Sequence, residues 1–236
     1  MNIRLTTLFI VLGVLFMNGF VAVAAAQNDD SNSRVYETDT FDRLFLEGAF
    51  NVELIQGKRP SVKMQVSDPK AFDYLKLTNE NGMLHVHVDR KPFDLRKITL
   101  YITFDELNWM RIFGSIRLQT KGYLDLDELE MTLEGGARIN FQAKADVISI
   151  VNKGGVMVEL SGVTDVLDMY MAGAGHINAG ELKAKDVDFR IDGVGTGKVY
   201  ATRSLNATIK GAGKINYKGD PEVKENIEGL GSVSQE

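Results

Sequence analysis

The three histidines are the first candidates for chemistry, because the chain contains no cysteine. His85 and His87 flank Val86, so on a β-strand both imidazoles point to the same face. Such a pair could supply two ligands of a metal ion, but spacing identifies no third ligand. Exposed strand histidines are more often simple polar surface, so we predict no metal and no other cofactor. His176 stands alone at a variable, exposed position, which does not indicate catalysis.

Carboxylates are the next candidates. The segment "YLDLDELE" carries Asp125, Asp127, Glu128 and Glu130, whereas a glycosidase needs two carboxyl groups held across a cleft. An acidic turn on a solvated surface is the simpler interpretation. The sequence has no G-x-S-x-G elbow and no H-E-x-x-H motif. We therefore predict a protein that is not an enzyme and has no catalytic residues, with a carbohydrate-active β-helix enzyme of lyase or glycosidase type as the alternative.

A glycine-rich motif recurs along the chain. The stretch "AGAGHINAG" at 172–180 returns as "KGAGKINYKG" at 210–219 and, more weakly, as "EGGARINF" at 134–141. A nucleotide-binding glycine loop requires a helix after the glycines, and a calcium β-roll requires an aspartate in each repeat. Here period-two alternation continues after each motif. Of the glycines that recur once per repeat, only Gly193 has an aspartate beside it, namely Asp192. The glycines are therefore predicted to form corners, where positive φ or close backbone approach is needed.

The elements around these glycines repeat at a fixed interval. Each repeat contains one glycine that recurs at this interval. The positions two, four and six residues before that glycine are apolar, except at Asn152 and Glu225, and the residues between these positions are mostly polar. This alternation indicates strands with one buried face. A leucine-rich repeat is rejected because the step is two throughout. Six glycines lie 18 to 20 residues apart, namely Gly135, Gly154, Gly173, Gly193, Gly211 and Gly229.

Units this short cannot bury their own apolar face, whereas stacked units can. We therefore predict an all-β protein, a right-handed parallel β-helix or β-solenoid with coils of about 18–20 residues and a less regular N-terminal part. The single domain is expected over 41–234, with irregular coils over 41–120 and regular repeats over 121–234. A β-sandwich is the alternative for 41–104. The segment "DPKAFDYLKL" predicts a short helical turn that begins at Asp68 and Pro69.

The N-terminus has the layout of a secretory signal peptide over 1–26. An apolar run follows Arg4 and ends in Ala24, Ala25 and Ala26, which suit an A-x-A cleavage site. A retained membrane anchor is the alternative, because the apolar run is long. Residues 27–40 are polar and are expected to be a flexible lead-in. After cleavage we predict an exported protein without an integral membrane domain.

Two outward ladders are candidate binding surfaces. One contains Thr132, Val151, Tyr170, Arg190, Thr208 and Asn226. The other, the candidate strip, contains Arg138, Asn140, His176, Asn178, Lys198, Lys214 and Asn216. Amide and basic side chains in register could bind glycans or acidic polymers; alternatively they satisfy one another on a flat sheet. The net charge of −5 argues against nucleic acid or an anionic membrane as partner.

The elements "GHIN", "GKIN" and "GARIN", the opening "FDRLFLEGAFNVELIQG" and the ending "NYKGDPEVKENIEGLGSV" resemble the family called the putative auto-transporter adhesin head GIN domain. The resemblance covers roughly 41–233 and departs at "VMVE", 156–159, and "GKVY", 197–200. It implies an exported protein of the periplasm or cell surface and assigns no catalytic residues. The expected role is an adhesin-like or structural envelope module whose partner is a glycan or another envelope protein. A ligand-free scaffold is the alternative.

Overall fold

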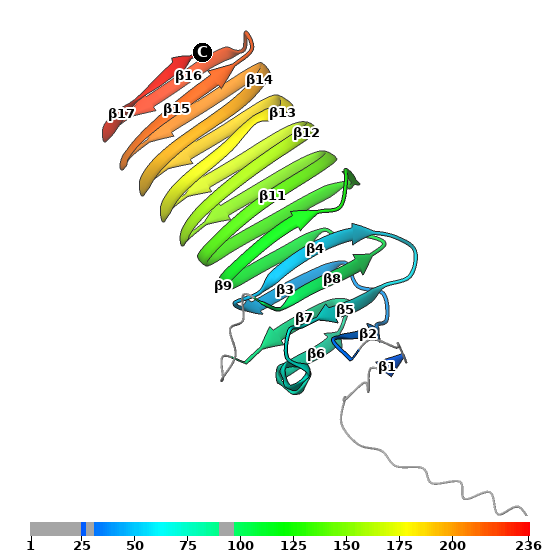
Figure 1. Ribbon diagram of the computed structural model, residues 1–236. Helices are drawn as coiled ribbons and strands as arrows, with labels where there is room; N and C mark the ends of the chain where they lie inside the picture. Colours follow the sequence, from blue (N-terminus) through cyan, green and yellow to red (C-terminus); the bar gives the residue numbers. More distant parts are fainter. Residues whose placement is uncertain (1–24, 27–30, 90–96) are drawn as a thin grey trace, which may run out of the picture.

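The computed structural model describes residues 25–26, 31–89 and 97–236, and its chain winds into a β-solenoid of about seven turns (Figure 1). The predicted all-β solenoid is confirmed. The signal-peptide prediction lies outside the described residues except at Ala25–Ala26, which form a short strand. No helix among the described residues is long and apolar enough to cross a membrane.

The strands of the N-terminal part are β1 Ala25–Ala26, β2 Ser33–Glu37, β3 Arg43–Gly48, β4 Asn51–Gln56, β5 Ser61–Gln65, β6 Leu75–Glu80, β7 Met83–Val88, β8 Thr99–Phe104 and β9 Trp109–Thr120. Those of the regular part are β10 Leu124–Asp125, β11 Glu128–Asn152, β12 Gly155–Met171, β13 Ala174–Ile191, β14 Val194–Ile209, β15 Ala212–Lys218, β16 Glu222–Ile227 and β17 Leu230–Gln235. One 3₁₀ helix, η1, spans Pro69–Tyr74 and confirms the predicted turn, with the Asp68 side chain accepting a hydrogen bond from the Lys70 amide at 3.0 Å.

The regular part stacks parallel coils in register. Gly136 on β11 pairs with Gly155 on β12, which pairs with Ala174 on β13, and the next partners are Val194 and Ala212. Alternate side chains point inward because a strand presents successive residues to opposite faces. The repeat predicted from the glycine interval is therefore the structural coil.

The glycines that recur once per coil lie above one another in the stack and form a glycine column, which explains how closely the coils stack. A Cβ added to Gly154 would lie 2.1 Å from the carbonyl oxygen of Gly135, and the same clash with the preceding column glycine recurs from Gly114 to Gly229, at 1.8 to 2.4 Å. The column also begins earlier than predicted, at Gly48. Within it, φ lies in the left-handed region only at Gly48, Gly114 and Gly135. Close backbone approach, rather than positive φ, is therefore the general requirement.

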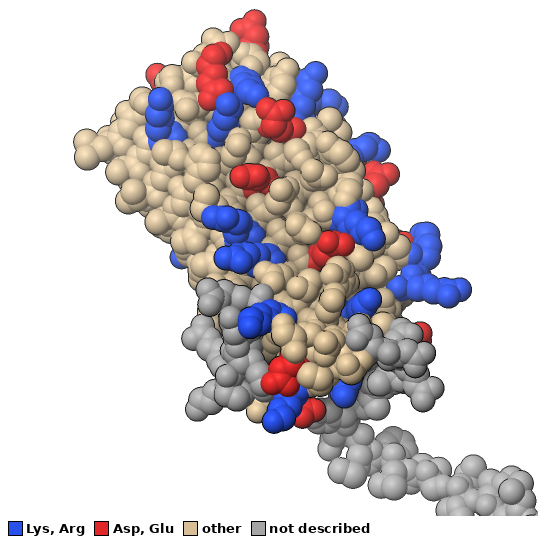
Figure 2. Space-filling model, viewed as in Figure 1, with Lys and Arg blue, Asp and Glu red and all other residues tan. Residues whose placement is uncertain are grey.

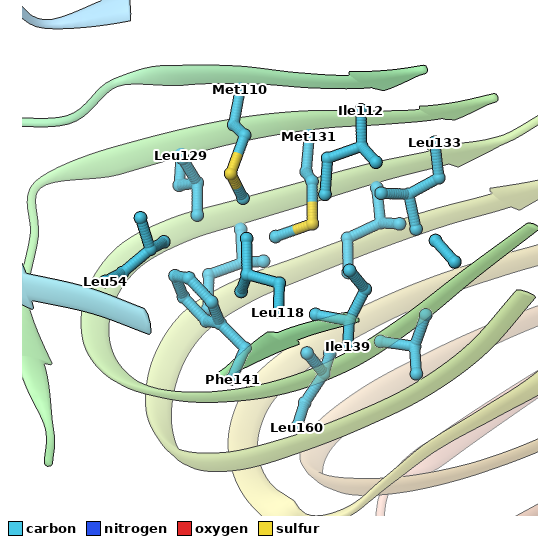
Figure 3. Close-up of a cluster of buried hydrophobic side chains, with 14 of the residues drawn as sticks. Leu54, Met110, Ile112, Leu118, Leu129, Met131, Leu133, Ile139, Phe141 and Leu160 are labelled. Atoms are coloured by element: carbon cyan, nitrogen blue, oxygen red, sulfur yellow. The ribbon is translucent and has the colours of Figure 1, made fainter. Parts of the chain in front are cut away.

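The interior of the coils is filled by apolar side chains. Figure 3 shows Met110 of β9 and Met131 and Phe141 of β11 projecting into one cluster, and all three are at most 1 % exposed. Asn152 is fully buried in an otherwise apolar column. Its amide donates to the Ala174 carbonyl at 3.2 Å and accepts from the Gly154 amide at 2.8 Å. The polar exception is thus hydrogen-bonded, as a buried amide must be.

In the N-terminal part, spatial order differs from chain order. Strands β3 and β4 pair in parallel with β9, and on their other side with β7 and β8. The coils therefore run β7–β8, β3–β4, β9 and then β11 along the axis. Strands β3, β4, β7 and β8 thus belong to coils of the same solenoid rather than to a sandwich. Antiparallel strands β2, β5 and β6 complete this end of the sheet (Figure 1).

The expectation of a flexible lead-in over 27–40 is wrong for residues 33–37. These form β2, which pairs antiparallel with β5. Ser33 is buried, Tyr36 packs against the core, and the Arg34 guanidinium lies 4.3 Å from the centroid of the Phe72 ring. The polar composition of this stretch concealed the pairing, because an edge strand needs few apolar residues.

Candidate binding face

The candidate strip lies on one outward face of the parallel sheet, in two adjacent rows. The register places Arg138, Met157, His176, Thr196 and Lys214 in one row. It places Asn140, Glu159, Asn178, Lys198 and Asn216 in the other. All seven predicted residues thus share a face, but Met157 and Glu159 of β12 interrupt the strip.

The C-terminal half of the strip is largely satisfied by its own neighbours. His176 Nδ1 lies 2.6 Å from Thr196 Oγ1, and the Asn178 side chain accepts from the Gly180 amide at 3.1 Å. Asn216 accepts from Ser234 at 3.0 Å, and Lys198 forms an ion pair with Glu236. This half fits the interpretation that stacked polar side chains bond to one another.

The N-terminal half of the strip opens into a hollow. The rows of Arg138 and Asn140 continue onto β9, β4 and β8. Together these strands line an open hollow of about 430 Å³, within the size range of ligand sites. Its outward side chains are those of Asn51, Glu53, Thr99, Tyr101, Arg117, Gln119, Arg138 and Asn140.

Some polar side chains of the hollow already have hydrogen-bond partners, and others do not. Gln119 Nε2 donates to Glu53 Oε2 at 2.9 Å, and the Tyr101 hydroxyl donates to Gln65 at 3.2 Å. Among the described residues, the exposed side chains of Arg117 and Asn140 have no hydrogen-bond or ion-pair partner. A guanidinium, an amide and a tyrosine ring are therefore available together, and such groups can bind hydroxyl or carboxylate groups and pack against a sugar ring.

Sequence reasoning missed most of this hollow, although a signal existed for part of it. Arg138 and Asn140 lie three and five residues after column glycine Gly135. Arg117 and Gln119 bear the same relation to Gly114, and Asn51 and Glu53 to Gly48. Tyr101 has no such glycine before it, and only the pairing of β8 with β4 brings it there.

The first ladder lies on the other side of the glycine corner, beside a second hollow of about 410 Å³. Two carboxylates line it, Asp168 and Asp188, which are register partners on adjacent strands. Burial, and then the charge of Asp188, raises the pKa of Asp168. Arg190 does not neutralise these two carboxylates, because its guanidinium donates hydrogen bonds to Asp192 at 2.8 and 2.6 Å. The carboxylates therefore stand side by side on one sheet, not across a cleft as a glycosidase requires.

The acidic stretch lies on the solvated surface. Asp125, Asp127, Glu128 and Glu130 are all exposed, and Asp125 forms an ion pair with Lys144 at 3.3 Å. Figure 2 shows lysine and arginine interspersed with aspartate and glutamate over the face in view, without one dominant sign. A mixed surface of this kind favours solubility over steering of a highly charged polymer.

His85 and His87 lie on the outward face of β7, as predicted, and a third group joins them. Glu47 on the neighbouring strand β3 places Oε2 3.0 Å from His85 Nε2 and 3.2 Å from His87 Nδ1. Spacing in the sequence did not reveal Glu47 because β3 precedes β7 by several intervening strands and the 3₁₀ helix.

Comparison with known proteins gives a family and a fold. A family model described as "Putative auto-transporter adhesin, head GIN domain" matches residues 40–221. No curated protein matches the chain. A crystal structure of a "putative adhesin" from Bacteroides fragilis NCTC 9343 aligns with a TM-score of 0.77 at 22% identity, covering 86% of this chain and 96% of that one.

Two structures from Parabacteroides distasonis ATCC 8503 are also similar. One, of a "putative lipid binding protein", aligns with a TM-score of 0.66 at 24% identity, covering 87% of this chain and 97% of that one. The other, of a "putative adhesin", has the same TM-score at 20% identity, covering 86% and 96%. At these identities the likeness establishes the shared fold.

Proposed function

The chain belongs to the family of the auto-transporter adhesin head GIN domain, and from this membership we propose that it is an exported, non-enzymatic, adhesin-like binding module of the cell envelope. Its partner is a glycan of the periplasm or cell surface, held by the hollow around Arg117 and Asn140. The single observation that carries this proposal is that two unpartnered polar side chains converge with Tyr101 in one hollow of the outward face, among the residues that the structure describes.

The chemistry of the hollow favours a sugar over other partners. Amide and guanidinium groups donate several directed hydrogen bonds, which suit the hydroxyl and carboxylate groups of a saccharide. The Tyr101 ring offers an apolar surface beside them. The flat sheet leaves the ends of the hollow open, so a chain of sugars can run along the rows.

The test is a glycan array that includes neutral and uronate-containing oligosaccharides, read with the tag-free mature chain. An Arg117→Ala/Asn140→Ala double variant is expected to lose at least tenfold in affinity for any glycan that binds. The matched control is Lys214→Ala/Asn216→Ala, at the other end of the candidate strip, which should bind as the wild type does. Circular dichroism verifies that both variants keep the fold.

Fractionation of cells accompanies the array, because an adhesin must reach the envelope. A chain that binds no glycan and is recovered as a soluble periplasmic protein would contradict the adhesin-like role. A chain that binds equally well after the Arg117→Ala/Asn140→Ala change would contradict the hollow as the site. The ligand-free scaffold is the function that remains only in the first case, where no glycan binds.

A lipid partner, suggested by the name of the "putative lipid binding protein" with the same fold, receives no support from a specific feature of this chain. The coil interior is filled by side chains such as Leu118, Ile139 and Leu160, each at most 3 % exposed, so an acyl chain finds no space beside them (Figure 3). Sedimentation with phosphatidylglycerol vesicles serves as the comparison arm, and we expect no binding.

A further inference from the structure

The outward face of the two outermost parallel coils brings two imidazoles and one carboxylate together. His85 and His87 stand two residues apart on β7, and Glu47 stands opposite His87 on β3. The ligand atoms of the three residues all lie within 4.8 Å of one another. The two strands that carry them are paired in parallel along five residues, so the backbone holds the three groups at a fixed spacing.

The distances match a tetrahedral metal site. Glu47 Oε2 is 3.0 Å from His85 Nε2 and 3.2 Å from His87 Nδ1. Zinc bonds of about 2.0–2.1 Å place neighbouring ligand atoms of a tetrahedron about 3.3 Å apart. The carboxylate oxygen therefore already lies at nearly the ligand spacing from both nitrogens.

The hydrogen bond made by Nε2 of His87 determines that its other ring nitrogen, Nδ1, is the one that can bind a metal ion. Its Nε2 lies 2.8 Å from Oδ1 of Asp89, whose other oxygen is held by Lys76 at 2.7 Å. A carboxylate only accepts, so Nε2 is the nitrogen that carries the hydrogen. A neutral His87 then presents a bare lone pair at Nδ1. Hydrogen bonding of a ligand histidine to an outer carboxylate is the usual arrangement at zinc sites.

His87 Nδ1 is the atom that lacks a partner. It is buried and makes no hydrogen bond with any described residue, although Glu47 Oε2 lies 3.2 Å away. Two acceptors facing each other at this distance repel unless a cation or a proton lies between them. A metal ion bound by both atoms removes the repulsion and satisfies the buried nitrogen.

The surroundings hold His85 in place and leave the cluster partly exposed to solvent. The Phe45 ring stacks on the His85 imidazole at 4.4 Å and an interplanar angle of 9°. Arg111 lies over the Phe45 ring at 5.1 Å and donates to Glu134 at 2.7 Å, so its charge is balanced by Glu134 rather than by Glu47. The side chains of His85, His87 and Glu47 are 32%, 26% and 30% exposed, so the cluster can be reached from solvent.

We propose that Glu47, His85 and His87 bind one Zn²⁺ ion, with Asp89 orienting His87 and solvent completing the tetrahedron. Two imidazoles and one carboxylate suit Zn²⁺, whereas Ca²⁺ and Mg²⁺ prefer oxygen ligands alone. The ion would link β7 to β3. These strands lie in adjacent coils, and their order along the solenoid axis is the reverse of their order in the sequence. It lies on the side of the glycine corner opposite the sugar-binding hollow, and the two proposals stand independently.

The test titrates ZnCl₂ into the tag-free mature chain after treatment with a chelator, by isothermal calorimetry. We expect one Zn²⁺ per chain, a raised melting temperature, and no comparable effect of CaCl₂ or MgCl₂. Co²⁺ in place of zinc should give the visible absorption of a tetrahedral site. Glu47→Gln should weaken binding at least tenfold, and His85→Gln/His87→Gln should abolish it.

The matched control is His176→Gln, which removes the remaining histidine and should bind zinc as the wild type does. Asp89→Asn should weaken binding about 10–100-fold while the ligands stay in place. Circular dichroism of each metal-free variant reports whether it folds. Absence of stoichiometric zinc binding by the folded wild type overturns the proposal and leaves a hydrogen-bonded histidine–glutamate cluster. Unchanged binding by folded His85→Gln/His87→Gln overturns it as well.

Discussion

Gly154 lies against Gly135 so closely that a Cβ on Gly154 would stand 2.1 Å from the Gly135 carbonyl oxygen and 2.5 Å from its nitrogen. The contact is between backbones, so no flexible side chain can move aside to relieve it. The same relationship repeats at each corner of the solenoid, which is why the glycines recur once per coil.

Replacing Gly154 by alanine should therefore destabilise the fold. The added methyl group forces the coils apart, at a cost of about 1–3 kcal/mol, which is the range for overpacking. At about 2–4 °C per kcal/mol for a chain of this size, the melting temperature should fall by several degrees. The control is Gly155→Ala, since a Cβ there meets nothing within 4 Å. Equal melting temperatures for the two variants would contradict this account of the corner.

Asn152→Leu should destabilise the protein even though leucine matches the apolar column. The change leaves the Gly154 amide and the Ala174 carbonyl without the hydrogen bonds that Asn152 supplies. Leaving such groups unpaired costs about 1–3 kcal/mol where they are fully buried, and these two are only partly buried, so the loss should fall at the lower end of that range. Met171→Leu is the matched control, because Met171 is the register partner of Asn152 on the next coil. Urea denaturation measures both, and a neutral Asn152→Leu change would show that the bonds are dispensable.

Asp186 should make stability depend on pH at the acidic end. Hydrogen bonds from Arg203 and Ser204 lower the pKa of Asp186 to about 2. Because the folded pKa is below the unfolded value of about 3.9, the stabilisation is complete well above pH 3.9 and is lost as the pH falls towards 2.

Asp186→Asn should accordingly lower the urea midpoint at pH 6, and its difference from the wild type should shrink as the pH falls towards 2. Asp125→Asn is the control, because the ion pair of Asp125 with Lys144 is 76% and 69% exposed and such pairs contribute little. A constant difference between Asp186→Asn and the wild type across this range would show that the loss is not electrostatic.

The regular coils could be predicted from the sequence because each coil satisfies one local rule. A backbone contact requires glycine at the corner, and a single buried face requires apolar residues at every second position before it. Both requirements recur with each coil, so they leave a period in the sequence. The same rule extends to Gly48 and Gly114, and through them it would have placed Arg117 and Asn51 beside Arg138.

The N-terminal order could not be predicted in this way. Strand β7 alternates like any other strand, and nothing in its residues specifies that β3 will lie between it and β9. That order arises from long-range pairing and from the antiparallel strands at this end. Glu47 and Tyr101 reach their clusters only through this order. The sequence therefore revealed the histidine pair and two residues of the hollow, Arg138 and Asn140.

The Asp168→Asn variant tests the enzyme alternative against the binding module. Burial and the charge of Asp188 raise the pKa of Asp168, so ionising this carboxyl disfavours the folded state. Stability is therefore greatest below the unfolded pKa and declines as the pH rises through the raised, folded value. Asparagine removes the charge, so Asp168→Asn should melt at a higher temperature than the wild type at pH 7 and at a similar temperature at pH 3.

An unfavourable carboxylate of this kind persists in enzymes where catalysis needs it, and its removal then raises stability while abolishing activity. In the proposed binding module the same change should raise stability and leave glycan binding at the Arg117 hollow unchanged, because Asp168 lies on the other side of the glycine corner. Asp165→Asn, at an exposed aspartate on the same strand, controls for the loss of one negative charge. Polysaccharide cleavage by the wild type that disappears in Asp168→Asn but persists in Asp165→Asn would establish the enzyme instead.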